Sequence, residues 1–340
     1  MRRLKILATA LLVSASGVRA DVPNVVVDIP PVFSLVSSVM QGVGTPKLLL
    51  RGNESPHNFA LRPSQRRDLG QADIIFWIGE GLTPWLEKAQ ASLTQTPISV
   101  ALGEQTGVVQ LSFREGAFFE NHDDHDDHDG RGEVNGHTEH NRAETHENAA
   151  AHDGKDHQDH AGHDHAGLDP HFWLDPENAI HWIYTIADIL SQKDPENAGA
   201  YYANATRTKA SLELLNKNIA QQLAPHRAER FLIVHDAFQY FEARFGLAAQ
   251  GAISDGHAAP PSAARILAIR KLMQDQKISC VFAEPGYNAK LLDNLISETS
   301  VRLKQLDPLG AGLPLDHTLY EAVLQNMADT MVACFTNNEG

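Results

Sequence analysis

Short apolar runs alternate with amphipathic stretches along most of the chain, and this alternation predicts the fold class. The apolar runs 25–29, 47–50 and 74–78 predict buried strands, because each is short and bounded by polar residues. A helical pattern at 64–70 separates the second run from the third. Strands that alternate with helices are typical of an α/β layer built on a mostly parallel sheet.

Two long helical patterns occupy the middle of the chain. Asp175-Pro176 combines a good N-cap with proline at the first helical position, and Asp194-Pro195 repeats this start signal. Apolar residues recur at helical spacing in the first pattern (Ile180, Ile183, Ala187, Leu190) and in the second (Tyr201, Ala205, Leu212, Leu215, Ile219, Leu223). At 1.5 Å per residue the second helix would be roughly 43 Å long, enough to run along two lobes.

Strand signals resume after the second helix. Three more apolar runs predict strands, at 231–234, 281–283 and 301–306, and a helical pattern covers 262–274. We therefore predict an α/β fold of two lobes with mostly parallel sheets, joined by one long linking helix. The predicted parts are a first lobe at 21–193, a linking helix at 194–224 and a second lobe at 225–340. The sequence shows no obvious internal repeat.

A low-complexity segment rich in His, Asp and Gly interrupts the first lobe at residues 121–166. It holds eleven of the eighteen histidines: His122, His125, His128, His137, His140, His146, His152, His157, His160, His163 and His165. Residues 121–165 also hold thirteen Asp and Glu but three Lys and Arg, so they contribute −10 to the net charge of −15. Such a polar segment cannot bury a core, and we expect it to be disordered without metal.

The histidine-rich insert suits the weak collection of metal ions, because neutral imidazole is a common ligand of zinc and other late divalent metals. We interpret its histidines as accessory weak metal sites that concentrate ions. Two alternatives stay open: a sensor of zinc saturation, and a solubilising spacer whose histidines bind metal incidentally. The acidic balance argues against nucleic-acid binding, which needs a basic surface.

The first twenty residues are typical of a secretory signal peptide. Arg2, Arg3 and Lys5 precede a short apolar stretch, and Val18-Arg19-Ala20 provides small residues for cleavage before Asp21. The apolar stretch is too short to remain as a membrane span. We expect a soluble protein in the periplasm, with an ordinary N-terminal helix as the alternative.

The chain contains two cysteines, Cys280 and Cys334. In an oxidising compartment an even pair indicates a structural disulfide. The alternative is a pair of thiolate zinc ligands, which is weaker because neither cysteine has a CxxC or CxxH neighbour.

Three histidines stand apart from the insert, each at the end of a predicted element. His57 follows a predicted strand in a loop, His171 precedes the helix that starts at Pro176, and His235 ends a buried strand. Asp307 ends another strand. Ligands of open α/β sheets bind beyond the carboxyl ends of the strands. Three imidazoles with a carboxylate or water suit tetrahedral Zn²⁺, so we predict a metal site from these four residues.

The four phrases that carry these residues, in this order, resemble the metal-binding periplasmic components of ABC transporters for zinc and manganese, and most closely the zinc-binding ones. The pattern H-(N/D)-(F/Y)-x-L-x-P matches 57–63, H-x-W-L-(S/D)-P matches 171–176, H-D-A-(F/Y)-x-Y-F matches 235–241 and L-D-P-L-G matches 306–310. The resemblance covers nearly the whole mature chain. It implies two α/β lobes, a rigid linking helix, and metal held in the cleft between the lobes.

Further traits of the zinc members recur here. A histidine-rich acidic insert in the first lobe is one, and a disulfide in the second lobe is another. Manganese members place glutamate where His235 stands, and imidazole favours later metals than oxygen ligands do. In one departure, some zinc members have glutamate directly before the first histidine, where this chain has Pro56. Asp307 or a water molecule must then complete the metal shell, or Asp307 orients a histidine from outside it.

The resemblance implies a protein that is not an enzyme. It would bind Zn²⁺ as transported ligand and deliver it, as a monomer, to the membrane permease of an ABC transporter with its cytoplasmic ATPase. One alternative is a manganese or other divalent-metal binding protein of the same family. A second is a zinc hydrolase, although no HExxH motif occurs. A third is a periplasmic zinc buffer without a transport partner.

Overall fold

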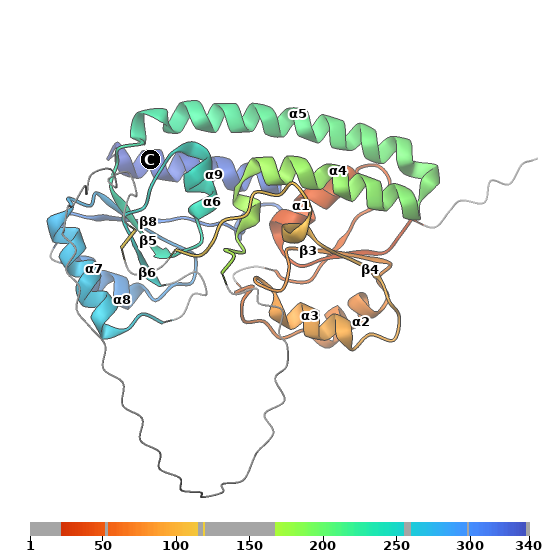
Figure 1. Cartoon of the computed structure of the whole chain (residues 1–340), viewed down its shortest axis with the longest axis horizontal. Coiled ribbons are helices and arrows are strands. Elements are labelled where there is room, and N and C mark those ends of the chain that lie inside the picture. Colours follow the sequence, from red (N-terminus) through yellow and green to blue (C-terminus); the bar gives the residue numbers. More distant parts are fainter. Residues whose placement is uncertain are drawn as a thin grey trace, which may run out of the picture. The chain divides into compact units, whose positions relative to one another are not determined.

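Two parallel sheets of the same topology underlie the fold of the described residues (Figure 1). The computed structural model describes residues 22–51, 54–114, 118–119, 167–254, 260–297 and 299–337. The predicted signal peptide and histidine-rich insert lie outside these residues. Contacts group the described residues into one unit, which contains both sheets.

Each sheet has its first strand inside and its second strand at one edge. The first sheet, in the order β2-β1-β3-β4, contains β1 (Val25–Val27), β2 (Lys47–Leu48), β3 (Ile74–Trp77) and β4 (Ile98–Ala101). The second, in the order β6-β5-β7-β8, contains β5 (Phe231–His235), β6 (Ala252–Ser254), β7 (Cys280–Ala283) and β8 (Arg302–Gln305). Every pairing within them is parallel. The predicted fold of two parallel-sheet α/β lobes is confirmed.

Helices connect the strands and cover the sheets. In the described residues they are α1 (Pro30–Val39), α2 (Pro63–Gly70), α3 (Pro84–Ala91), α4 (Pro176–Lys193), α5 (Ala198–Leu223), α6 (Gln239–Phe245), α7 (Ala263–Asp275), α8 (Ala289–Ile296) and α9 (Leu319–Phe335). Short 3₁₀ turns occur at Leu102–Glu104, Phe172–Leu174, Pro195–Asn197 and Ala224–His226. None of these helices is both long and apolar enough to cross a membrane.

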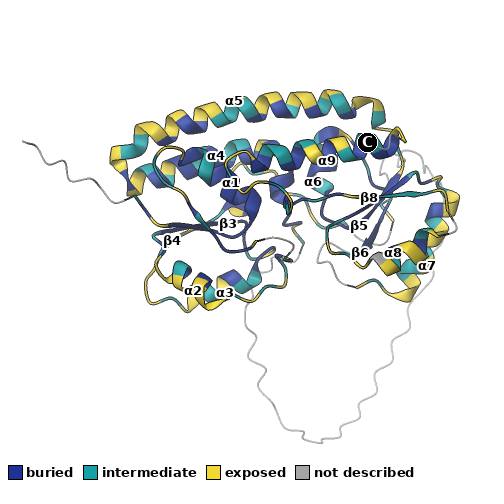
Figure 2. Cartoon of the chain, turned by 180° about the vertical axis from the view of Figure 1, so that it is seen from behind, coloured by how far each residue is buried: buried dark blue, intermediate teal, exposed yellow. Residues whose placement is uncertain are grey.

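The inner strands β1, β3, β5 and β7 are buried on both faces, as parallel strands usually are. Val25 and Val27 of β1 face a large apolar core, whereas Val26 joins a smaller cluster with Leu69 of α2 and Leu86 of α3. Alternate residues of a strand point to opposite faces, so one short strand contributes to two layers. Figure 2 shows buried residues along β3 and β5, and α5 exposed along much of its length.

The large core continues from one lobe into the other. It includes Val27 of the first sheet, Ile233 of the second, Trp182 of α4, Leu212 of α5 and Tyr320 of α9. Both α4 and α9 pack against α5, which therefore links the two lobes (Figure 1). The exact lobe boundaries given above stay a prediction.

The linking helix is slightly shorter than its predicted span. Asp175 caps α4 as expected, since its side chain accepts a hydrogen bond from the backbone N–H of Glu177 at 2.9 Å. Asp194 does not act as a cap, because its carboxylate accepts hydrogen bonds from Tyr201 and Asn197. A 3₁₀ turn follows it, and α5 then runs for 26 residues, about 39 Å. All the apolar positions predicted to line α5 are buried.

A disulfide joins Cys280 of β7 to Cys334 of α9, as predicted. It closes a sequence separation of 54 residues and attaches the last helix to a central strand of the second sheet. The alternative of two thiolate zinc ligands is wrong, because both sulfurs are in this bond.

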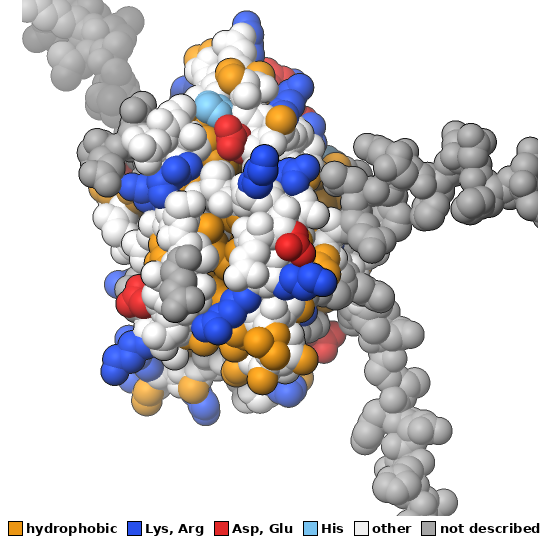
Figure 3. Space-filling model, turned by 90° about the vertical axis from the view of Figure 1, so that its left-hand side faces the viewer, with side chains coloured by type: hydrophobic (Ala, Val, Ile, Leu, Met, Phe, Trp, Pro, Cys, Tyr) orange, Lys and Arg blue, Asp and Glu red, His pale blue; other side chains and the backbone are white. Residues whose placement is uncertain are grey.

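The outer side of the second lobe, seen end-on in Figure 3, shows scattered lysine and arginine side chains and few acidic ones.

A buried carboxyl stands at the carboxyl end of β1. Asp28 accepts hydrogen bonds from the backbone N–H groups of Ile29 at 2.8 Å and Ile78 at 2.9 Å. Burial raises the pKa of Asp28 from 3.8 to about 7, although these hydrogen bonds lower it. Between about pH 4 and pH 7, Asp28 is therefore protonated in the folded protein but ionised in the unfolded chain.

This raised pKa predicts a loss of stability with rising pH. The contribution of Asp28 is fully present below the unfolded pKa of about 4 and is lost as the pH rises to about 7. The Asp28→Asn variant cannot titrate, so its free energy of unfolding should fall less than that of wild type between pH 4 and 7.5, by on the order of 4 kcal/mol. Urea denaturation at both pH values measures this difference. The exposed Asp293→Asn substitution should leave the wild-type difference unchanged. Equal behaviour of the two variants would assign the pH dependence to other groups.

Candidate metal centre

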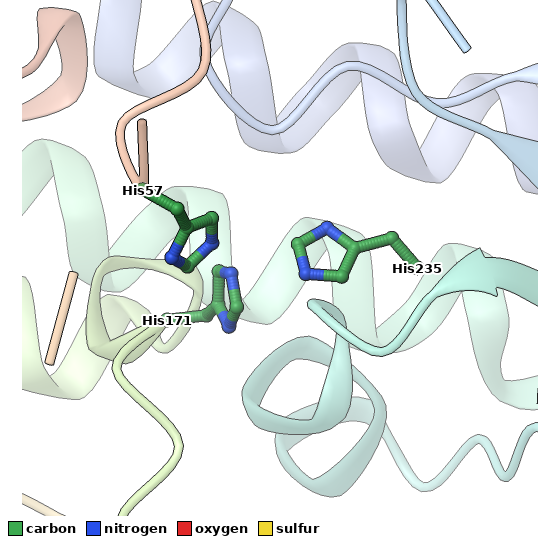
Figure 4. A group of neighbouring side chains, drawn as sticks. All are labelled: His57, His171 and His235. Carbon is green, nitrogen blue, oxygen red and sulfur yellow. The ribbon is translucent and has the colours of Figure 1, made fainter. Parts of the chain in front are cut away.

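Three histidines from three separate parts of the chain meet at one point. Each of His57, His171 and His235 offers one ring nitrogen, and these atoms all lie within 4.8 Å of one another. The ring centroids are 5.1 to 5.6 Å apart, and the rings are steeply inclined to one another. Figure 4 shows the three imidazoles pointing toward a common centre. The structure thus brings together the three predicted histidines.

His57 is carried by the loop between β2 and α2 and is half-buried. Its backbone neighbour Pro56 accepts a hydrogen bond from the indole N–H of Trp85 at 2.7 Å. Phe59 packs edge-on against the same indole, with the ring centroids 5.1 Å apart. One tryptophan of α3 therefore holds the loop on both sides of His57. Pro56, the departure noted in the sequence, contributes its carbonyl to this contact.

His171 lies directly before the 3₁₀ turn that leads into α4, and it is buried. The carboxyl of Asp169 accepts a hydrogen bond from the backbone N–H of His171 at 3.0 Å and pairs with Nδ1 of the His171 ring at 2.6 Å. Burial raises the pKa of Asp169 to about 7, against the lowering effect of the His171 N–H. One oxygen of Asp169 therefore contacts both the backbone and the ring of His171, which fixes the ring.

His235 is the last residue of β5, and its Nδ1 pairs with Glu284 at 2.8 Å. Glu284 directly follows β7, the neighbour of β5 in the sheet. Burial works against its ionisation, yet the interaction with His235 lowers the pKa of Glu284 below its ordinary value of 4.5. With Nδ1 engaged in both His171 and His235, Nε2 is the nitrogen of each ring that would bind a metal.

Neither carboxylate was identified from the sequence. Asp169 lies only two residues before His171, but its pairing depends on the local turn. Glu284 is 49 residues from His235 in sequence. A usable signal existed, because a polar residue directly after a buried apolar strand is the feature that selected His235 and Asp307.

Asp307 follows β8 and lines the same pocket as the histidines, but it is not part of the group of ligand atoms within 4.8 Å. Its Oδ1 accepts the backbone N–H groups of Leu309 and Gly310 at 2.9 Å, and its Oδ2 accepts that of Ala311 at 2.6 Å. These bonds shape the turn after β8. Its role as a fourth ligand stays a prediction.

The pocket over the histidines has a volume of about 300 Å³ and is lined from both lobes. The first lobe contributes Glu54, Pro56 and Trp173 beside its histidines, and the second contributes Tyr287 and Pro308 among others. A pocket of this size suits an ion with its remaining solvent. The histidines of the insert lie outside the described residues, and their role as accessory metal sites stays a prediction.

A sequence model of the ZnuA family, described as zinc-uptake complex component A, periplasmic, matches residues 25–334. The chain belongs to this family. Among curated relatives named high-affinity zinc uptake system protein ZnuA, that of Brucella suis biovar 1 (strain 1330) is 40% identical over 97% of both chains. That of Paracoccus denitrificans (strain Pd 1222) is 42% identical, again over 97% of both. The family resemblance drawn from the four phrases is confirmed.

Solved structures show the same fold. A crystal structure of ZnuA has a TM-score of 0.68 at 24% identity and covers 91% of this chain and 99% of its own. A 138–173 deletion mutant of ZnuA with zinc bound also scores 0.68, at 23% identity, covering 92% and 98%. The solute-binding protein FpvC from Pseudomonas aeruginosa in complex with Mn²⁺ scores 0.70 at 20% identity, covering 93% and 99%. The same fold therefore occurs with different metals.

The two carboxylate–imidazole pairs generate a prediction. Asp169→Asn and Glu284→Gln should each weaken zinc binding by about 10- to 100-fold, because each removes the acceptor that orients a ring and raises its basicity. Competition with a chelator of known affinity measures the change. As control, Asp188→Asn removes a carboxylate that accepts a hydrogen bond from exposed Tyr202 at 2.6 Å, and should have no effect. Unchanged affinity in both site variants would show that the carboxylates do not support the histidines.

Proposed function

We propose that this protein captures Zn²⁺ in the periplasm and delivers it to the membrane permease of an ABC transporter for import. The observation that carries the proposal is the convergence of three imidazoles, with ligand atoms within 4.8 Å of one another, from separate elements of two lobes. In this proposal His57, His171 and His235 bind the ion. Asp307 or a water molecule completes the shell.

The ligand set favours zinc over manganese. Zn²⁺ readily takes three histidines and a fourth ligand in tetrahedral geometry, whereas Mn²⁺ prefers carboxylate and carbonyl oxygens. Cu²⁺ would bind such a site at least as well, by the Irving–Williams order. Zinc as the physiological ion therefore also depends on which metals are available and which ion the permease accepts.

Further parts of the proposal concern how the protein works in the cell. The names of the relatives support uptake, because each is called a high-affinity zinc uptake system protein. We infer that residues 1–20 direct export and that the mature chain acts as a soluble monomer. It binds its ligand without transforming it, and it acts together with a permease and a cytoplasmic ATPase.

The decisive experiment uses the mature chain from Asp21, stripped of metal with a chelator. Zn²⁺ and Mn²⁺ are titrated against wild type and against a variant in which His57, His171 and His235 are all alanine. Wild type should show one tight zinc site, which the triple variant lacks, and should bind manganese weakly. Tight binding that survives in the triple variant would locate the site elsewhere in the chain. Tight manganese binding would favour the alternative of a manganese-binding protein of the same family.

The histidine-rich insert generates a separate prediction. We propose that it collects ions at weak sites, on the basis of its eleven histidines and its charge of −10. Deletion of residues 122–165 should leave the tight site intact and remove several weak ones in a calorimetric titration. The same total stoichiometry before and after deletion would contradict the collecting role. The triple alanine variant is the complementary control, because it should lose only the tight site.

A further inference from the structure

The two ends of the described chain that flank the insert pair with each other. Ser112 and Leu168 form an antiparallel bridge, the N–H of Phe113 donates to Gly167 at 2.7 Å, and the N–H of Asp169 donates to Leu111 at 2.8 Å. We call this pairing of residues 111–114 with 167–169 the base ribbon. It carries Asp169, the partner of His171.

The base ribbon is fixed to α6 of the second lobe. The Tyr240 hydroxyl accepts a hydrogen bond from the N–H of Leu111 at 2.9 Å and donates one to the carbonyl of Asp169 at 2.9 Å. One side chain of the second lobe therefore binds both strands of the ribbon. Beyond the ribbon, Phe119 donates its N–H to the carbonyl of Gln250 at 3.1 Å, so this residue also attaches to the second lobe.

Arg114 attaches the ribbon to the second lobe through two ion pairs. Its guanidinium pairs with Glu242 at 2.8 and 3.0 Å and with both oxygens of Asp236. The arginine side chain is 17% exposed and each carboxylate 3%, so these ion pairs are largely shielded from water. The ring of Phe119 covers the guanidinium at 3.9 Å. A fork that holds two carboxylates at once is a geometry that lysine cannot reproduce.

The positions of these partners connect Arg114 to the metal centre. Asp236 is the residue after His235, and the ribbon that carries Arg114 also carries Asp169. The guanidinium thus joins the residue next to His235 to the base ribbon, whose Asp169 orients His171. Its charge also lowers the pKa values of Asp169 and Asp236, against the raising effect of burial.

We propose that Arg114 is a positioning residue of the histidine cluster, which holds the ribbon bearing Asp169 and the strand end bearing His235 in one arrangement. The proposal rests on the proposed function, since it assumes that the cluster binds zinc. Arg114 itself does not contact the metal; it acts through Asp236 and through the ribbon.

A purely electrostatic role predicts the opposite sign. Arg114 is a cation near a cation site, so its loss would leave zinc binding unchanged or tighter if charge alone mattered. Positioning predicts weaker binding, because the imidazoles would no longer be held at one point before the metal arrives. The direction of the change therefore separates the two roles.

The test compares Arg114→Met and Arg114→Lys with a matched control, Arg244→Met. Arg244 also bridges the lobes, since it pairs with both oxygens of Asp175 at 2.7 Å, and it is likewise partly buried. Zinc affinity is measured on the full mature chain by chelator competition. The visible absorption of substoichiometric Co²⁺ reports the geometry of the tight site, and thermal unfolding of the metal-free protein reports stability.

Arg114→Met should weaken zinc binding by about tenfold, at the lower end of the effects known for groups that orient metal ligands. It should also alter the Co²⁺ spectrum. Arg114→Lys, which keeps the charge and loses the fork, should weaken binding as well, and it serves as the folded variant if methionine is not tolerated. Arg244→Met should lower stability without changing zinc affinity or the spectrum.

Three results would overturn the proposal: unchanged or tighter zinc binding in Arg114→Met, wild-type affinity in Arg114→Lys, or an equal loss of affinity in Arg244→Met. Failure of the proposed function is distinguishable from all three. In that case wild type itself has no tight site that the triple alanine variant loses, and Arg114 has no metal cluster to position.

Discussion

A metal site made of imidazoles depends on which nitrogen of each ring carries the proton and where the other nitrogen points. In this protein, two carboxyl groups, the buried Asp169 and the partly buried Glu284, determine both for two of the three rings. Asp169 and Glu284 each engage a Nδ1, so the opposite nitrogen is directed toward the centre of the cluster. A carboxylate buried without a partner would be costly, so each pair stabilises the acid as well as orienting the ring. The surrounding fold serves mainly to keep these pairs buried and close together.

Parallel sheets make this arrangement possible because all their strands end at the same edge. In the second lobe, His235 ends β5 and Glu284 follows the neighbouring strand β7, so the pair forms directly across the sheet. Asp307 follows β8, the next strand along. Ligands of such folds usually bind beyond the carboxyl ends of the strands, at the point where the strand order reverses. The first lobe supplies its two histidines differently, from a loop and from the turn before α4.

The sequence predicted these features unevenly, for physical reasons. Helices α4 and α5 were placed well, because their apolar residues recur over many turns and Pro176 marks a start. The strands β4 and β6 were not predicted, because Ile98–Ala101 includes a serine and is partly exposed, and Ala252–Ser254 contains a single large apolar residue. The three histidines were found because each follows or precedes a predicted element and lies in a phrase that resembles the family pattern. Glu284 and Arg114 were missed because their partners lie far away in sequence, at separations of 49 and 122 residues.

The shared apolar core has a consequence for how the protein unfolds and opens. Because one continuous cluster includes residues of both sheets and of α4, α5 and α9, the lobes share their largest core, and each lobe adds a smaller cluster of its own. They should melt together in a single cooperative transition. Swinging the lobes widely apart would expose part of that core to water, which is costly in proportion to the apolar area exposed. Local movements of the pocket rim would therefore let an ion enter and leave at a lower cost in free energy. Among the three histidines only His57 is not fully buried, so its loop is the part of the rim that can move most easily.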